Sequence, residues 1–154
     1  MREPVRKLWR FAPALLCLSL GMPAMSAPKA AATPAGAVVT LDVYSGRPNP
    51  SWPLSEALTA ELRRRLDGMP ASKPAGSEFD GLGYRAVSAE LPASAGAAVV
   101  TAARGVVTYE GGGERRAYAD PGRQFELWLV RTGADHLPPD LLQYVEREVA
   151  KPQP

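Results

Sequence analysis

The residues best spaced for catalysis are three acidic side chains in segments where apolar and polar residues alternate. Asp42, Glu90 and Glu110 each lie in a stretch where apolar and polar residues alternate. Two carboxyl groups that face each other across a sheet could act as general acid and general base. The same pattern is typical of ordinary charges on a solvated face. We therefore name no catalytic residue and keep a small carboxylate-dependent hydrolase as an alternative function.

Neither the histidine nor the glycine run indicates an active site. His136 is the single histidine and directly follows Asp135, whereas a Ser-His-Asp enzyme needs an acid that lies across the imidazole ring. We expect His136 to be a solvated loop residue. The run of glycines at residues 111–113 lies between apparent strands, although a phosphate-binding loop leads into a helix. The sequence predicts no metal site and no cofactor, because the ligands for a catalytic zinc are missing.

The segment SGRPNPSWP at residues 45–53 is the most unusual local feature. Its prolines restrict the backbone, so we expect an irregular but stiff connection. This connection would present Tyr44, Arg47, Asn49 and Trp52 near one edge of a sheet, and we predict these four as binding residues. The guanidinium of Arg47 suits a carboxylate and the indole of Trp52 offers a stacking face, which indicates a small anionic ligand or a protein partner. The alternative is structural, with Arg47 and Asn49 bound to the backbone and Trp52 filling the core.

The residues around this segment also carry a resemblance. The run VYSGRPNPSW, a Leu-rich helix, LGYR and terminal helices containing LWL and YVERE resemble a family of small proteins with the opening V-[YF]-S-G-R-P-N-P. The match spans about residues 38–149, and SGRPNP is its most specific part. The family has no assigned activity, so the resemblance implies a single domain and no particular function.

The elements that must position these residues follow from periodicity. Residues 38–44, 84–91, 99–103, 106–110 and 116–119 alternate as strands do, and the Arg104-Gly105 pair suits a two-residue hairpin. A helix should begin after Ser55, a good N-cap, and end at Gly68. Asp120 with Pro121 should open a second helix that ends at Gly133, and residues 138–140 a third.

This order predicts an α+β fold. We expect a small, mainly antiparallel sheet of 3–5 strands with about three helices packed on one face, in the order β-α-β-β-β-α-α. The globular domain should cover residues 37–150. Residues 27–36 are small and proline-rich and should form a flexible lead, and residues 151–154 should be a disordered tail.

The first 26 residues read as an export signal. A basic start precedes an apolar run at residues 11–20 and small residues near the expected cleavage site, where Ala24 and Ser26 occupy positions −3 and −1. The apolar run is too short for a membrane-spanning helix, so no transmembrane anchor should remain after cleavage. Leu16 before Cys17 is too bulky for a lipobox, which argues against a lipoprotein. We expect a periplasmic or extracellular protein.

Cleavage would change the charge and the redox chemistry of the chain. The full sequence has 18 basic and 16 acidic residues, and removal of four basic residues and Glu3 leaves 14 against 15. A nearly neutral domain gives no reason to expect a nucleic acid partner. Loss of Cys17, the single cysteine, excludes an intramolecular disulfide. We therefore predict a non-enzymatic binding domain of the cell envelope. A hydrolase acting on an envelope polymer and a structural envelope component are the alternatives, and the oligomeric state is open.

Overall fold

The computed structural model describes residues 36–73, 82–92 and 96–152. All of these belong to the second of the two units into which the chain divides, residues 32–154. The predicted signal at residues 1–26, most of the flexible lead at 27–36 and the last two residues of the predicted tail lie outside the described part. Within the described part, no helix combines the length and apolar character that crossing a membrane requires.

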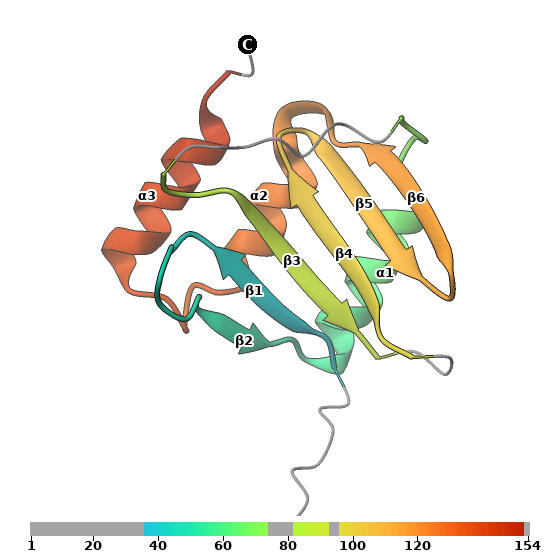
Figure 1. The fold of residues 1–154 in the computed structure, drawn as a ribbon, viewed down its shortest axis with the longest axis horizontal. Coiled ribbons are helices and arrows are strands. Elements are labelled where there is room, and N and C mark those ends of the chain that lie inside the picture. Colours follow the sequence, from blue (N-terminus) through green and yellow to red (C-terminus); the bar gives the residue numbers. More distant parts are fainter. Residues whose placement is uncertain (1–35, 74–81, 93–95, 153–154) are drawn as a thin grey trace, which may run out of the picture. The chain divides into compact units, whose positions relative to one another are not determined.

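A single antiparallel sheet organises this unit (Figure 1). Its strands follow the spatial order β2-β1-β3-β4-β5-β6, so the last four form a meander and β1 lies between β2 and β3. The strands comprise β1 (Val38–Asp42), β2 (Ser51–Pro53), β3 (Ala86–Leu91), β4 (Ala98–Ala103), β5 (Val106–Gly111) and β6 (Glu114–Ala119). The α+β class with an antiparallel sheet is confirmed. The prediction of at most five strands is wrong, because the sheet has six.

The additional strand, β2, lies inside the segment predicted to be irregular. Residues 51–53 pair antiparallel with β1, with Val39 opposite Trp52. Proline is compatible with this position because β2 is an edge strand, where a missing N–H leaves no ladder bond unmade. The carbonyl of Pro50 still accepts a hydrogen bond from the Leu41 amide at 2.9 Å. The prolines therefore shorten the strand without preventing it.

Two tight hairpins build the other half of the sheet. Arg104 and Gly105 connect β4 to β5 with φ values of 50° and 77°, and Gly112 and Gly113 connect β5 to β6 with φ values of 60° and 79°. Positive φ at both central residues is the geometry of a type I′ turn, whose twist matches that of the flanking strands. The hairpin predicted at Arg104-Gly105 is confirmed.

Three helices lie on one face of the sheet (Figure 1). They are α1 (Glu56–Asp67), α2 (Gln124–Arg131) and α3 (Pro139–Ala150), with a short 3₁₀ turn, η1 (Pro121–Arg123), before α2. The hydroxyl of Ser55 accepts a hydrogen bond from the Leu58 amide at 3.2 Å, which confirms the predicted N-cap of α1. Leu62 and Leu66 are buried against the sheet, as the i, i+4 spacing predicts.

The second predicted helix begins later than expected. Gly122 and Arg123 have φ values of 68° and 54°, so the backbone leaves the right-handed region and α2 starts only at Gln124. The carboxylate of Asp120 nevertheless caps it, accepting hydrogen bonds from the Phe125 amide at 2.9 Å and the Glu126 amide at 3.0 Å. The predicted capping role of Asp120 is confirmed. The turn between Asp120 and α2 was not predicted, because hydrophobic periodicity does not reveal it.

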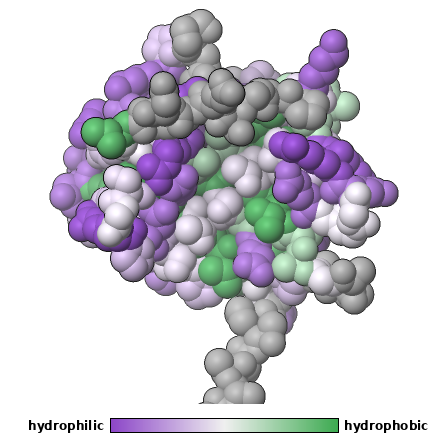
Figure 2. Space-filling model, in the orientation of Figure 1, coloured by the Kyte–Doolittle hydropathy of each residue, from purple (hydrophilic) through white to green (hydrophobic). Residues whose placement is uncertain are grey.

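The opposite face of the sheet carries small and hydroxylated side chains. Register places one row of them across five strands, comprising Ser51, Thr40, Ser88, Thr101 and Thr108. Figure 2 shows pale and green residues along the middle of this face and hydrophilic residues on both sides. Val99, which is 38% exposed, contributes to its apolar character. The core therefore lies between the sheet and the helices, and this open face is only moderately apolar.

Candidate functional site

The segment at residues 43–50 is held by a side chain from within it. The carbonyl oxygen of Asn49 accepts hydrogen bonds from the amides of Val43 at 3.1 Å and Tyr44 at 2.8 Å. The Asn49 side-chain nitrogen donates to Asp42 Oδ1 at 2.9 Å. Asn49 therefore fixes the loop after β1, which is the structural alternative considered for this residue.

Asp42 is the second anchor of the loop. Its Oδ2 accepts a hydrogen bond from Arg85 Nε at 2.9 Å, and Oδ1 pairs with Arg85 Nη2, which also donates to the Tyr44 carbonyl at 2.7 Å. The hydrogen bonds from Arg85 lower the pKa of Asp42; partial burial opposes this effect, and Asn49 and the charge of Arg85 reinforce it. The carboxylate of Asp42 therefore has a structural role, whereas the hydrolase alternative would need a carboxylate that is free to react.

The lowered pKa of Asp42 leads to a pH-dependent prediction. A carboxyl whose pKa is lower in the folded protein adds stability above its unfolded value of about 3.9, and this stability is lost as pH falls through the folded value. We expect Asp42→Asn to destabilise the protein at pH 7 and the difference from wild type to shrink below about pH 4. Urea unfolding across this pH range measures it. Asp135→Asn, in an exposed turn, is the control, and a pH-independent difference for Asp42→Asn would contradict the prediction.

The other predicted binding residues divide between core and surface. Trp52 is 1% exposed, and its Nε1 donates a hydrogen bond to Thr132 Oγ1 at 2.9 Å. Arg47 is exposed, and its guanidinium carbon lies 3.4 Å from the centroid of the Tyr44 ring. Tyr44, Arg47 and Asn49 are thus close together, whereas Trp52 faces the core. Of the four residues, Arg47 is exposed and Tyr44 and Asn49 are partly exposed, whereas Trp52 is buried.

The other two candidate carboxylates, Glu90 and Glu110, lie on the open face of the sheet, outside any pocket described below. Glu90 and Glu110 both lie opposite Val99, on either side of β4, so two strand spacings of about 4.8 Å separate their backbones. Glu110 forms an ion pair with Arg115 at 3.0 Å. His136 is exposed in the turn before α3, as expected. None of these residues lines the pockets described below.

A buried ionic cluster lies between the sheet and the helices. Glu126 is fully buried, and its carboxylate accepts hydrogen bonds from Tyr84 Oη at 2.6 Å, Arg123 Nε at 2.8 Å and Arg123 Nη2 at 2.7 Å. Arg123 also donates to the carbonyl of Glu148 at 3.0 Å near the end of α3. Burial, followed by the charge of Glu126, raises the pKa of Tyr84 well above its usual value. The cluster joins the start of β3 to both C-terminal helices, so we assign it a structural role.

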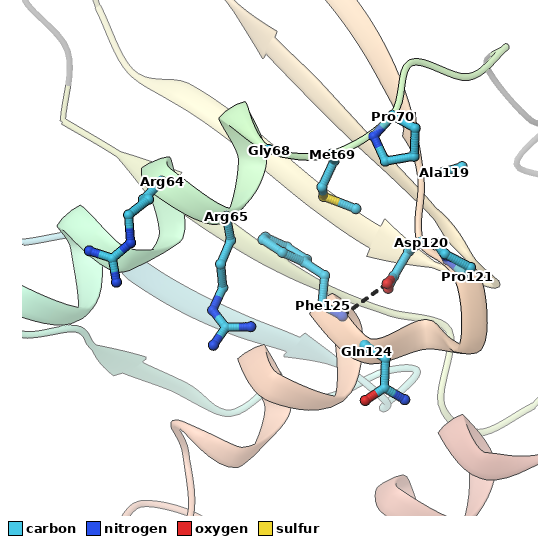
Figure 3. Close-up of a pocket in the computed structure, with 10 residues that line it drawn as sticks. All are labelled: Arg64, Arg65, Gly68, Met69, Pro70, Ala119, Asp120, Pro121, Gln124 and Phe125. Atoms are coloured by element: carbon cyan, nitrogen blue, oxygen red, sulfur yellow. Dashed lines mark hydrogen bonds between the residues drawn. The ribbon is translucent and has the colours of Figure 1, made fainter.

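An open groove between α1 and α2 brings arginine side chains close to apolar ones (Figure 3). Its volume is about 480 Å³. We call it the α1–α2 groove, and it is lined by Arg64, Arg65, Gly68, Met69, Pro70, Ala119, Asp120, Pro121, Gln124 and Phe125. Figure 3 shows Arg65 reaching from α1 on one side and Asp120 and Pro121 on the other, with Met69 and Phe125 between them, whereas Arg64 points outward from α1. The groove thus combines an apolar floor with guanidinium groups at its rim.

The charge of the rim is positive. Arg64 and Arg65 both pair with the carboxylate of Glu61, in the latter case at 2.6 Å, so two cations share one anion. Each guanidinium has five N–H donors, more than one carboxylate can use. The carboxylate of Asp120 on the far wall is directed at the amides of α2 that it caps. An anionic group is therefore favoured at the arginine side of the groove.

The indole ring of Trp128 packs against the guanidinium of Arg65. The guanidinium carbon of Arg65 lies 4.7 Å from the Trp128 ring centroid, within the range of a cation–π interaction. The ring of Trp128 in turn lies 5.7 Å from that of Phe125, at an interplanar angle of 52°. The rim and floor of the groove are thus connected through aromatic contacts. This arrangement holds the Arg65 guanidinium in place, which reduces the entropic cost of binding a ligand.

Sequence reasoning did not predict this groove. The arginines at residues 63–65 were assigned no role from the sequence. The available signal was the combination of three consecutive arginines with Met69-Pro70 at the helix end. The contribution of Phe125 could not be inferred, because it depends on how α2 packs beside α1.

No protein-family model matches the chain, and neither the curated proteins nor the solved structures include a significant match. The resemblance based on SGRPNP therefore stays a prediction, and the functional argument depends on the site itself.

Proposed function

We propose that this protein is an exported, non-enzymatic binding domain of the cell envelope that holds a carboxylate-bearing ligand in the α1–α2 groove. The carboxylate binds the guanidinium group of Arg65, at the arginine side of the groove. An apolar face of the ligand packs on Met69, beside the buried Phe125. Export by the N-terminal signal is part of the proposal and depends on the sequence of residues 1–26 alone.

The observation that carries the proposal is the juxtaposition of the Arg65 guanidinium with an apolar floor in one groove of about 480 Å³. Ligand sites are mostly apolar concavities with a few polar groups that fix orientation, and volumes of about 300–1,000 Å³ are usual. The predicted loop at Tyr44 and Arg47 offers one exposed guanidinium without a comparable apolar surface. The groove is therefore the better candidate for the small anionic ligand that the sequence predicts.

Matched ligands test the role of the charge. We expect cyclohexanecarboxylate to bind more tightly than the neutral cyclohexanecarboxamide, because the two share an apolar ring and differ in the group that would meet the arginines. The protein is purified in the form in which the cell accumulates it. Binding is followed by the fluorescence of Trp128, which lies under Arg65, and Trp128→Phe should remove the signal. Equal affinity for acid and amide would contradict the proposal.

Removing the rim arginine should weaken this binding. We expect Arg65→Ala to lower the affinity for cyclohexanecarboxylate about fivefold, which corresponds to about 1 kcal/mol for a partly exposed charge-assisted hydrogen bond. Affinity for the amide should change little. Isothermal titration calorimetry measures both. Arg147→Ala, an exposed arginine on α3, is the matched control, and an equal loss in that variant would show that the effect is not specific to the groove.

A further inference from the structure

The three consecutive arginines of α1 point in three directions. Successive helical residues are rotated by about 100°, so Arg63, Arg64 and Arg65 cannot share one face. Leu62 and Leu66 mark the buried side of the helix. Arg63 and Arg65 flank this stripe on opposite sides, and Arg64, whose side chain is 75% exposed, lies between them on the outer surface. The guanidinium groups therefore form a band that crosses the helix.

The band leads from the α1–α2 groove to a second cavity on the other side of α1. We call this cavity of about 220 Å³ the Arg63 pocket, and it is lined by Arg63, Leu66, Asp67, Leu91, Pro92, Ala98, Tyr109, Arg116 and Tyr118. Arg63 Nη2 donates a hydrogen bond to the Pro92 carbonyl at 3.0 Å. The guanidinium carbon of Arg116 lies 5.7 Å from the Tyr109 ring centroid. Two cations and two tyrosines thus surround one small cavity.

Charges near this pocket are partly balanced. Asp67 lines the wall, and Arg116 pairs with Glu114. Arg63 and Arg116 each carry more N–H donors than these contacts use, since one guanidinium has five. Bidentate pairing with a carboxylate is a geometry that arginine favours. The pocket therefore has the donors for a carboxylate together with aromatic faces and hydroxyls for the body of a ligand.

A sugar ring fits this combination. It has apolar C–H faces that pack on aromatic rings and hydroxyls that exchange hydrogen bonds with tyrosine and arginine. A uronic acid adds the carboxylate within the same ring. An extended acidic peptide would instead direct successive side chains to opposite sides, so that only alternate carboxylates could face the helix. Both cavities combine an apolar surface with arginine side chains. A polymer that repeats one acidic ring is therefore favoured as the ligand.

We propose that the ligand is an acidic polysaccharide whose chain crosses α1, with one uronic acid in the α1–α2 groove and another in the Arg63 pocket. This inference rests on the proposed function, because it assumes that the groove binds carboxylates. A helix with its side chains is about 10–12 Å wide. A ligand must therefore be an oligomer to occupy both cavities, with Arg64 meeting the part of the chain between them.

Oligogalacturonates of increasing length test this geometry. We expect affinity to rise by about 100-fold once the oligomer is long enough to reach both cavities, because the second contact becomes intramolecular. In the Arg63→Ala, Arg116→Ala double variant this step should disappear, while binding of galacturonic acid monomer in the groove falls by less than twofold. Arg147→Ala should keep the wild-type length dependence. Methyl-esterified hexagalacturonate, which has the same length without free carboxylates, should not show the step.

Three outcomes would overturn the inference. Affinity that rises only in proportion to the number of sugar units would show that the two cavities are not bridged. An unchanged step in the double variant, with its fold verified by circular dichroism, would exclude the Arg63 pocket. Tighter binding of hexaglutamate than of hexagalacturonate would favour an acidic peptide. Failure of the proposed function is distinguishable, because cyclohexanecarboxylate and galacturonic acid would then both fail to bind in the groove.

Discussion

Replacing Glu126 with alanine is expected to lower the free energy of unfolding by about 3–5 kcal/mol. The carboxylate of Glu126 is fully buried and receives hydrogen bonds from both Tyr84 and Arg123. Its removal leaves the guanidinium of Arg123 buried without its counter-ion, which is the costly way to break such a pair. Urea unfolding at pH 7 measures the change.

A second Glu–Arg pair in the same protein supplies the control. Glu146 on α3 pairs with Arg131 on α2 at 2.7 Å, but the Arg131 side chain is 60% exposed. Glu146→Ala should cost no more than about 1 kcal/mol, because exposed ion pairs contribute little. The double variant of Arg123 and Glu126 to alanine should be less destabilised than the sum of the single variants. Additive losses, or a loss below about 1 kcal/mol for Glu126→Ala, would contradict a paired buried cluster.

Replacing Trp52 with alanine is expected to cost about 3–5 kcal/mol, as is usual for a large buried aromatic residue. Trp52 is 1% exposed and packs against Gly133, where an added Cβ would lie 2.8 Å from the indole ring. Gly133→Ala alone should therefore cost about 1–3 kcal/mol through overpacking. Thermal or urea unfolding of both variants measures these effects.

The combination of the two substitutions tests the contact directly. Once Trp52 is alanine, the added methyl group of Gly133→Ala has no indole ring to meet, so its cost should fall to near zero. Gly68→Ala is the matched control, since its Cβ would have ordinary contacts of 3.6 Å or more. An unchanged cost of Gly133→Ala in both backgrounds would show that the substitution acts through another contact.

Local signals in the sequence predict much of the fold. The start of α1 follows from Ser55, whose hydroxyl accepts a hydrogen bond from the amide three residues ahead, and the β4–β5 hairpin follows from Arg104-Gly105. Both depend on neighbours in the chain. β2 was missed because its existence depends on pairing with β1, and the late start of α2 because Arg123 adopts a positive φ, which is uncommon for a residue with a side chain.

The candidate site is less accessible to sequence reasoning. The loop at residues 45–53 stood out by composition, yet Asn49 is used to bind the backbone and Trp52 to fill the core. Composition shows that a segment is constrained but not what constrains it. The α1–α2 groove arises where three segments meet, so Met69 and Phe125 become neighbours only after folding. Glu126 likewise reads as a surface charge until Tyr84, 42 residues away, is placed against it.

The most direct test of the central claim is to locate the bound carboxylate by NMR. In a ¹⁵N-HSQC titration with cyclohexanecarboxylate, we expect the largest amide shifts at the residues lining the α1–α2 groove, notably Gly68, Met69, Gln124 and Phe125. Shifts concentrated instead in the loop around Arg47 would contradict the groove as the binding site and would support the loop that the sequence first indicated.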